Sequence, residues 1–205
     1  MTNQSRSVPR KKPRQERSRA TVDAILEAAA RVLVDSGYEA TSTRRVAELA
    51  GVSIGSLYQY FPSKEALVMA LAERQIQRVL EVCTEVLRPQ EGLPVREAAR
   101  RVALGVTKVY AVNPRLYQVL VSEGLKLGIM ERVQSLEQRM DAAVRSFLLS
   151  NQDILRPQRV ELATFVVMRA VRGVMWAAAT EQPSLFEDPA LVDELSELIL
   201  GYLHR

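Results

Sequence analysis

The chain has 205 residues and 47% of them are hydrophobic, which excludes a disordered protein and allows one large or two small domains. Its formal net charge of +4 is uneven, because residues 1–19 carry seven lysines and arginines against the single acidic Glu16; a basic arm on a mildly acidic body indicates a polyanionic partner. The single Cys83 excludes an internal disulfide and, with His204 as the one histidine, cannot form a usual structural zinc site.

Residues 1–16 are polar, basic and interrupted by proline, and we interpret them as a disordered arm. Two interpretations of this arm stay open: a solvated tail, or a non-specific or minor-groove contact to DNA. A first helix is predicted from about Arg17 to Asp35, because apolar residues recur there at helical spacing, and Gly37 ends it.

Residues 43–64 carry the most specific pattern in the chain. Thr43 is predicted to cap a short helix that ends at Gly51, since glycine takes the left-handed conformation beyond a helix at little cost. Ser53 is predicted to cap a second helix that runs to about Tyr60, where a proline blocks its continuation. Two short helices joined by a tight turn are the layout of a helix-turn-helix, whose second helix enters the major groove of DNA.

Small or polar residues open this second helix and let its backbone approach base edges: Ser53, Ile54, Gly55 and Ser56. Gly55 costs about 1 kcal/mol relative to alanine inside a helix, and close approach to DNA is the benefit we expect. Five more side chains complete the predicted DNA-binding surface, of which the glutamine can also read adenine: Arg44, Arg45, Tyr58, Gln59 and Tyr60. The alternative for the two tyrosines is that they only pack the helix on its neighbours.

The remaining two thirds of the chain also have helical periodicity, so the predicted fold class is all-α. We place a three-helix DNA-binding domain at residues 17–64 and a helical bundle for ligand binding and dimerisation at residues 65–205. Predicted helices cover residues 63–87, 95–112, 114–124, 129–149, 157–181 and 189–202, separated mostly by breaks that contain proline or glycine. A loop is predicted at 183–189, and Asp188 is predicted to cap the last helix.

One helix-turn-helix covers only a half-site, so we expect a homodimer on a palindromic operator in double-stranded DNA. Two seams on the last two helices are predicted to form the dimer interface: Ala163, Ala170, Gly173 and Ala177 on one, and Leu191, Leu195, Leu198 and Tyr202 on the other. The alternative is that both seams pack only within the chain.

A ligand site is predicted between the C-terminal helices, where methionine, aromatic and arginine side chains gather: Tyr110, Tyr117, Phe147, Phe165, Met168, Arg169, Arg172, Met175 and Trp176. A cation beside aromatic rings suits an aromatic acid, a fatty acid or another anionic hydrophobic molecule. The alternative is an ordinary core whose arginines are salt-bridged or extend to solvent.

The run from Thr43 to Lys64, preceded by Gly37-Tyr38-Glu39-Ala40-Thr41, closely resembles the DNA-binding segment of the TetR (tetracycline-repressor-like) transcriptional regulators. The resemblance covers roughly residues 15–70. It implies that Thr43, Tyr58, Tyr60 and Lys64 contact phosphate, and that a small hydrophobic effector releases the protein from its operator.

Two other classes of protein compete with this interpretation. One is a helix-turn-helix protein of architectural or activator type that has no small-molecule effector. The other is an enzyme, which we do not expect because the sequence shows no nucleophile–histidine pair, metal cluster or Gly-rich phosphate loop; no cofactor or metal is predicted. The sequence also shows no signal peptide and no run of about 18 apolar residues, so we expect a cytoplasmic protein without a membrane span.

Overall fold

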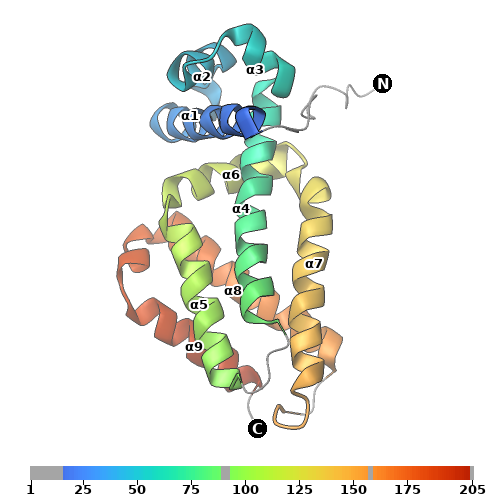
Figure 1. Cartoon of the computed structure of the whole chain (residues 1–205). Coiled ribbons are helices and arrows are strands. Elements are labelled where there is room, and N and C mark those ends of the chain that lie inside the picture. The colour runs from blue at the N-terminus through green and yellow to red at the C-terminus, as the bar shows by residue number, and fades with distance from the viewer. Residues whose placement is uncertain (1–15, 89–92, 157–158, 204–205) are drawn as a thin grey trace. The chain divides into compact units, whose positions relative to one another are not determined.

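Helices dominate the structure, a computed structural model that describes residues 16–88, 93–156 and 159–203 (Figure 1). Over these ranges the predicted all-α class is confirmed. The elements are α1 (Glu16–Ala40), α2 (Thr43–Ala50), α3 (Ile54–Tyr60), α4 (Lys64–Val86), α5 (Val95–Ala111), α6 (Pro114–Lys126), α7 (Ile129–Ser150), α8 (Val160–Glu181), the 3₁₀ helix η2 (Pro183–Glu187) and α9 (Ala190–Leu203).

The chain folds as two compact units that divide inside α4, between Arg74 and Gln75. The N-terminal unit holds the described residues up to 74 together with residues 119–132, and the C-terminal unit holds residues 75–118 and those from 133 onward. The division therefore falls beyond the predicted domain boundary at residue 64. It also assigns the second half of α6 to the N-terminal unit, which the helical pattern alone gave no reason to expect.

The N-terminal unit is built on a small apolar core. Four of its helices contribute side chains that are almost completely buried: Ile25 and Leu33 from α1, Val46 from α2, Leu57 from α3, and Leu67 and Val68 from α4. Gly37 breaks α1 near its end, with a positive φ of 74° that a side-chain-bearing residue rarely adopts. The short helices α2 and α3 are thus held by packing on α1 and α4 more than by their own length.

The caps of the two short helices agree with prediction except at one position. Ser42 caps α2, because it has extended dihedrals and its hydroxyl accepts from the Arg45 N–H at 3.2 Å. The prediction that Thr43 is this cap was wrong, since Thr43 is already helical. Gly51 ends α2 at φ 68° and Ser53 caps α3, accepting from the Ser56 N–H at 3.0 Å, as predicted.

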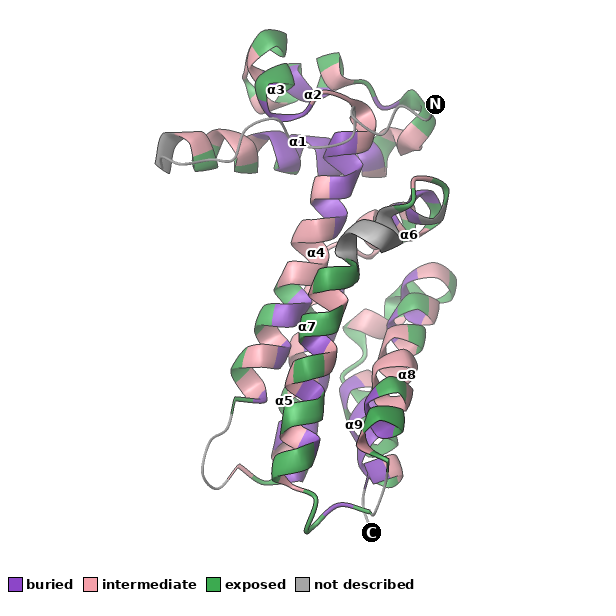
Figure 2. Cartoon of the chain, turned by 90° about the vertical axis from the view of Figure 1, so that its right-hand side faces the viewer, coloured by how far each residue is buried: buried purple, intermediate pink, exposed green. Residues whose placement is uncertain are grey.

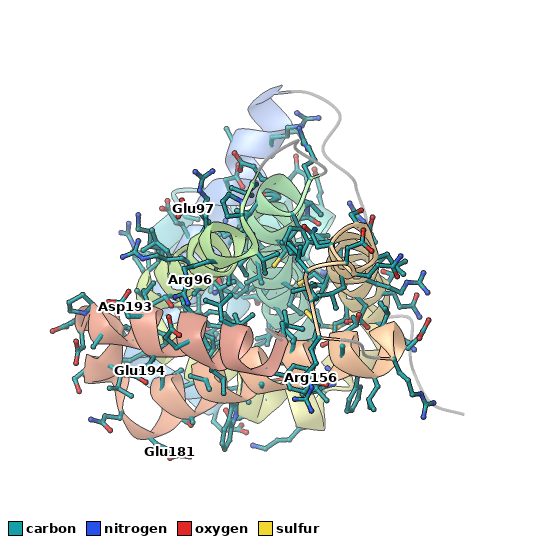
Figure 3. All side chains as sticks on the ribbon, turned by 90° about the horizontal axis from the view of Figure 1, so that it is seen from below. Arg96, Glu97, Arg156, Glu181, Asp193 and Glu194 are labelled. Carbon is teal, nitrogen blue, oxygen red and sulfur yellow. The ribbon has the colours of Figure 1, made fainter. Side chains whose placement is uncertain are left out.

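In the C-terminal unit the second half of α4 packs with α5, α7, α8 and α9 (Figure 1). Among the described residues, α5 and α9 share the most extensive helix contact. Ion pairs flank it: Arg96 bonds Glu197 at 2.5 Å and Arg100 lies 3.5 Å from Asp193. Figure 3 shows Arg96 of α5 and Asp193 of α9 on this side of the unit. These four side chains are mostly exposed, so the pairs contribute little, and the buried apolar side chains between the helices stabilise the unit.

Several predicted boundaries shift at the C-terminal end. The long apolar helix α8 begins at Val160, and its predicted start at Pro157 lies outside the described residues. The predicted loop after it contains the 3₁₀ helix η2. Asp188 accepts from the Ala190 N–H at 2.9 Å, as expected of a capping residue, and α9 starts at Ala190.

The helix α8 is long and apolar enough to resemble a membrane span, with a mean hydropathy of 1.4 over a window of which 28% is buried. Arg169 and Arg172 interrupt this stretch, so it is not the continuous apolar run whose absence the sequence indicates. Its buried face packs on the core through Ala163, Met175 and Ala178, while its other face exposes large apolar side chains (Figure 2). A helix of a soluble protein that packs against a partner has the same composition, so one such stretch is weak support for a membrane span.

Candidate nucleic-acid interface and ligand cavity

The N-terminal turn of α3 is open to solvent. Ser53, Ile54 and Gly55 are exposed, and Tyr58 and Gln59 follow one turn later on the same helix with similar exposure. A methyl group added at Gly55 would meet only the Ser53 Oγ, at 3.9 Å, so nothing inside the chain requires a glycine there. These predicted DNA contacts are therefore accessible from solvent, and Gly55 leaves the outer side of the helix unobstructed.

The exposed side of α2 adds polar groups from the preceding helix. The hydroxyl of Thr43 lies 3.0 Å from that of Tyr58, so these two predicted phosphate contacts are close enough to bind the same phosphate. Arg44 pairs with Glu48 at 3.2 Å, and Arg45 donates to the Ser36 Oγ at 2.6 Å. Both arginine side chains are exposed on a short helix, and such weak surface partners exchange readily for phosphate.

Tyr60 lies on the inner side of α3. Its side chain is 8% exposed and its hydroxyl is hydrogen-bonded to the Ser18 Oγ of α1 at 2.9 Å. The structure thus favours the packing role for Tyr60 over the phosphate contact implied by family resemblance. The reason is spacing. Two residues that stand two positions apart in an α-helix point about 200° apart around its axis, so when Tyr58 faces solvent Tyr60 faces inward.

Lys64 also has an internal partner. Its Nζ donates to the Tyr38 carbonyl oxygen at 2.8 Å and lies 4.0 Å from the centre of the Tyr38 ring. The Tyr38 hydroxyl donates to Glu65 at 3.1 Å, so the first two residues of α4 hold the end of α1. Burial and the neighbouring Glu65 carboxylate raise the pKa of Tyr38 far above its ordinary value, so the phenol remains a donor. Any phosphate contact by Lys64 must be made in addition to this anchoring role.

A cavity of about 100 Å³ lies inside the C-terminal unit, between α4, α5, α7 and α8. Apolar side chains form most of its wall, among them Val79 and Cys83 from α4, Val106 from α5, Val144 from α7 and Met175 from α8. Apolar cavities of about 150 Å³ accept a molecule of the size of benzene, so this one is in the range of a single ring. It is a candidate ligand site with apolar walls and a few polar groups.

The polar groups of the cavity form one charged cluster. Glu137 and Asp141 come from α7, and Arg169 and Arg172 come from α8. The Arg172 Nη1 donates to the Glu137 Oε1 at 2.7 Å, and the Arg169 Nη1 lies 3.9 Å from the other carboxylate oxygen. The structure favours the salt-bridged alternative for Arg172 and places Arg169 near the same carboxylate, so a role of either arginine in binding a ligand stays a prediction.

Two tyrosines and the cysteine add neutral polar groups. The rings of Tyr110 and Tyr117 meet edge to face with their centres 4.4 Å apart, and Tyr110 lines the cavity. Burial raises the pKa of both phenols, and burial also raises the pKa of the Cys83 thiol to about 11. All three groups are therefore protonated and uncharged at neutral pH.

Six of the nine predicted ligand-binding residues line this cavity: Tyr110, Phe147, Met168, Arg169, Arg172 and Met175. Tyr117 packs behind Tyr110. Phe165 and Trp176 do not line it, since their side chains are 56% and 43% exposed on the outer face of α8. We did not predict Glu137 and Asp141, although these acidic residues stand at helical spacing with apolar Met140 and Val144, a signal of charge on a buried face.

The predicted dimer seams divide between the inside and the outside of the chain. Ala163 and Leu195 are 2% exposed and pack within the subunit's own core, because their helices turn that edge toward α5, so for these two residues the alternative holds. Ala170, Ala177, Leu191 and Tyr202 are intermediate, and Gly173 and Leu198 are exposed. The apolar side chains that α8 and α9 expose most are instead Leu162, Phe165, Trp176 and Leu198.

The open α3 and the turn before it define the class of protein: a helix-turn-helix regulator that binds DNA. Comparison with known families agrees over most of the chain. Residues 25–71 match the family described as "Bacterial regulatory proteins, tetR family", and residues 94–203 match "Tetracyclin repressor-like, C-terminal domain". The chain belongs to the TetR family of transcriptional regulators.

Relatives and solved structures show the same pattern. The chain is 26% identical over 170 residues to the uncharacterised HTH-type transcriptional regulator YhgD of Bacillus subtilis, covering 78% of this chain and 85% of the relative. It is 32% identical over 117 residues to the HTH-type transcriptional repressor AcnR of Corynebacterium diphtheriae, covering 54% and 62%. The fatty acid degradation regulator FadR of Bacillus halodurans shares the fold, with a TM-score of 0.74 at 20% identity over 95% of this chain and all of that one.

Proposed function

We propose that two copies of this chain bind a palindromic operator in the cytoplasm, with α3 of each copy in the major groove, and that they repress transcription until a small hydrophobic molecule fills the C-terminal cavity. The observation that carries the DNA-binding part is the open N-terminal turn of α3. Gly55, which no contact inside the chain requires, sits there among exposed side chains that can donate or accept hydrogen bonds.

The exposed apolar face of α8 and α9 supports the dimer. Leu162, Phe165, Trp176 and Leu198 would be costly to leave in water in a monomer. Gly173 and Gly201 lie on the same two helices, and a methyl group added at either would meet no atom of this chain within 4 Å. Each glycine weakens its helix by about 1 kcal/mol, and packing within the chain does not explain its presence. The close approach of a helix from a second copy would explain it.

The position of α4 supports control by a ligand. Val79, Cys83 and Leu87 of this helix line the cavity, while Lys64 and Glu65 at its start bond Tyr38 of α1. A molecule that enters the cavity presses directly on the helix that anchors the DNA-binding segment. The ligand and the operator then favour different conformations of the protein, so binding of one lowers the affinity for the other.

Gly55→Ala provides the test of the DNA-binding surface. Alanine gains helix stability of about 1 kcal/mol at a position without steric conflict, so the variant should unfold at the same or a higher temperature. Its added methyl group should nevertheless weaken operator binding at least tenfold if the backbone of α3 approaches base edges. Fluorescence anisotropy on the operator fragment, selected from genomic DNA by wild-type protein, measures the affinity, and light scattering checks the dimer.

Wild-type affinity in a stable Gly55→Ala variant would show that α3 does not approach the bases at this point. A protein that stayed monomeric and bound all genomic fragments equally would contradict the proposed function as a whole. Selective binding without any response to small molecules would instead favour a helix-turn-helix protein that has no effector.

A further inference from the structure

The charged cluster of the cavity is balanced within the chain. It contributes two arginines and two carboxylates, so Arg169 and Arg172 carry no net positive charge beyond that of Glu137 and Asp141. Glu137 lies between the two arginines and its side chain is only 20% exposed, whereas theirs are 39% and 41% exposed. The arginines therefore have a permanent counter-ion from α7.

This balance disfavours a charged ligand of either sign. A ligand carboxylate near Arg172 would have to displace Glu137 or lie beside it, and two carboxylates that share one site repel each other. A ligand ammonium would meet the two arginines in the same way. Displacing Glu137 from Arg172 is unfavourable, because the carboxylate is only 20% exposed and would lose its closest counter-ion.

An uncharged polar group meets no such penalty. The Tyr110 hydroxyl and the Cys83 thiol line the cavity as neutral groups, and the rest of the wall is mainly valine, leucine and methionine. The volume of about 100 Å³ suits one ring and excludes a long acyl chain unless the helices separate.

We propose that the effector of this protein is a compact, uncharged molecule about the size of one ring, with a single hydroxyl or carbonyl group, and that Glu137 is the residue that selects against anions. This inference rests on the proposed function, in which the cavity is the effector site. It differs from the sequence-based expectation of an anionic ligand because α7 supplies acidic residues that the arginine pattern on α8 does not reveal.

The test uses three single-ring probes whose one substituent is neutral, anionic or cationic at neutral pH: benzyl alcohol, benzoate and benzylamine. Each is added to the full-length protein at neutral pH, and affinity is measured by calorimetry, with the shift in melting temperature as a second readout. We expect benzyl alcohol to bind at least tenfold more tightly than either ion. Slower alkylation of Cys83 in its presence would place the molecule in the cavity, since this thiol lines the wall.

Glu137→Gln should reverse the preference for benzyl alcohol over benzoate. It removes the counter-ion of the arginines and leaves a net positive cluster, so the affinity for benzoate should rise tenfold or more. Asp141→Asn removes one negative charge in the same way at a half-buried position, and it replaces Glu137→Gln in the test if that variant does not fold. Glu85→Gln is the matched control, since Glu85 is exposed on α4 and does not line the cavity, and it should keep the wild-type order.

Tighter binding of benzoate than of benzyl alcohol by wild-type protein would overturn the inference, as would no binding of any probe or an unchanged order in both charge variants. These results leave the operator assay untouched and so separate the two proposals. If benzyl alcohol protects Cys83 but does not alter operator affinity, the ligand class stands and the effector role of the cavity fails.

Discussion

Gly105 on α5 faces Val82 of α4 closely, and adding one carbon there tests the packing of two helices that line the cavity. A Cβ at this position would clash with the Val82 Cγ1 of α4 and would lie 3.4 and 3.5 Å from two further Val82 atoms. Valine is branched at Cβ and has few side-chain conformations, so the methyl group cannot move aside without shifting the backbone.

The size of the effect follows from two opposing contributions. Forcing an extra carbon into a packed site costs about 1–3 kcal/mol. Replacing glycine by alanine inside a helix returns about 1 kcal/mol. Gly105→Ala should therefore lose roughly 0–2 kcal/mol of unfolding free energy, with the loss near the upper end if the helices cannot separate.

Urea denaturation of wild type and variants at one fixed subunit concentration measures this, because dimer stability depends on concentration. Val82→Ala removes the Cγ1 that the new carbon would meet. The double variant Gly105→Ala/Val82→Ala should thus be more stable than the sum of the two single changes implies, by a coupling energy of about 0.5–3 kcal/mol. A Gly105→Ala protein that gained the full helix benefit of about 1 kcal/mol, as expected at the unobstructed Gly55, would refute the close contact between α4 and α5.

Two other predictions concern single functional groups. Tyr60→Phe removes the hydrogen bond to Ser18 and should lower the unfolding free energy by about 1 kcal/mol, whereas Tyr58→Phe should leave stability unchanged and weaken DNA binding with a smaller salt dependence. Equal losses of DNA affinity in both variants would argue against the different roles. Cys83 should react with iodoacetamide roughly a hundredfold more slowly at about pH 8 than a thiol of ordinary pKa near 9, because its pKa of about 11 leaves little thiolate. As pH rises from about 9 toward 11, the labelling of Cys83 should accelerate. The folded state should lose stability over the same range, because the unfolded chain releases the thiol proton at a lower pH than the folded chain does. Mass spectrometry measures the labelling, and fast labelling at pH 8 would contradict the buried site.

The sequence predicts the N-terminal unit well because local rules decide it. Gly51 takes a left-handed conformation and Ser53 caps the next helix, with only Val52 between them. The exception is instructive, since Ser42 and Thr43 are both good caps by type. Only the dihedral angles, which are extended at Ser42, distinguish the residue outside the helix from the first residue inside it.

The C-terminal unit was harder to predict because its site depends on partners far apart in sequence. The periodicity of α8 places Phe165, Arg172 and Trp176 close together in projection, but it does not say which side of the helix meets α7. In the structure Arg172 bonds Glu137, whereas Phe165 and Trp176, two turns and one turn away, are largely exposed. A salt bridge between residues 35 positions apart leaves no short-range sequence signal, and it changes the expected charge of the ligand.

The continuity of α4 gives the proposed control of DNA binding a physical route from the cavity to the start of the helix. This helix has 23 residues and contains neither glycine nor proline, so no hinge inside it absorbs a displacement of Val79 or Cys83. The boundary between the two compact units falls inside the same unbroken helix, and its first residues carry the bonds to Tyr38. Coupling along such an element is reciprocal: if benzyl alcohol weakens operator binding by some factor, the operator must weaken benzyl alcohol binding by the same factor. Two unequal factors in the same preparation would mean that the two sites are not linked through one equilibrium between two states of the protein.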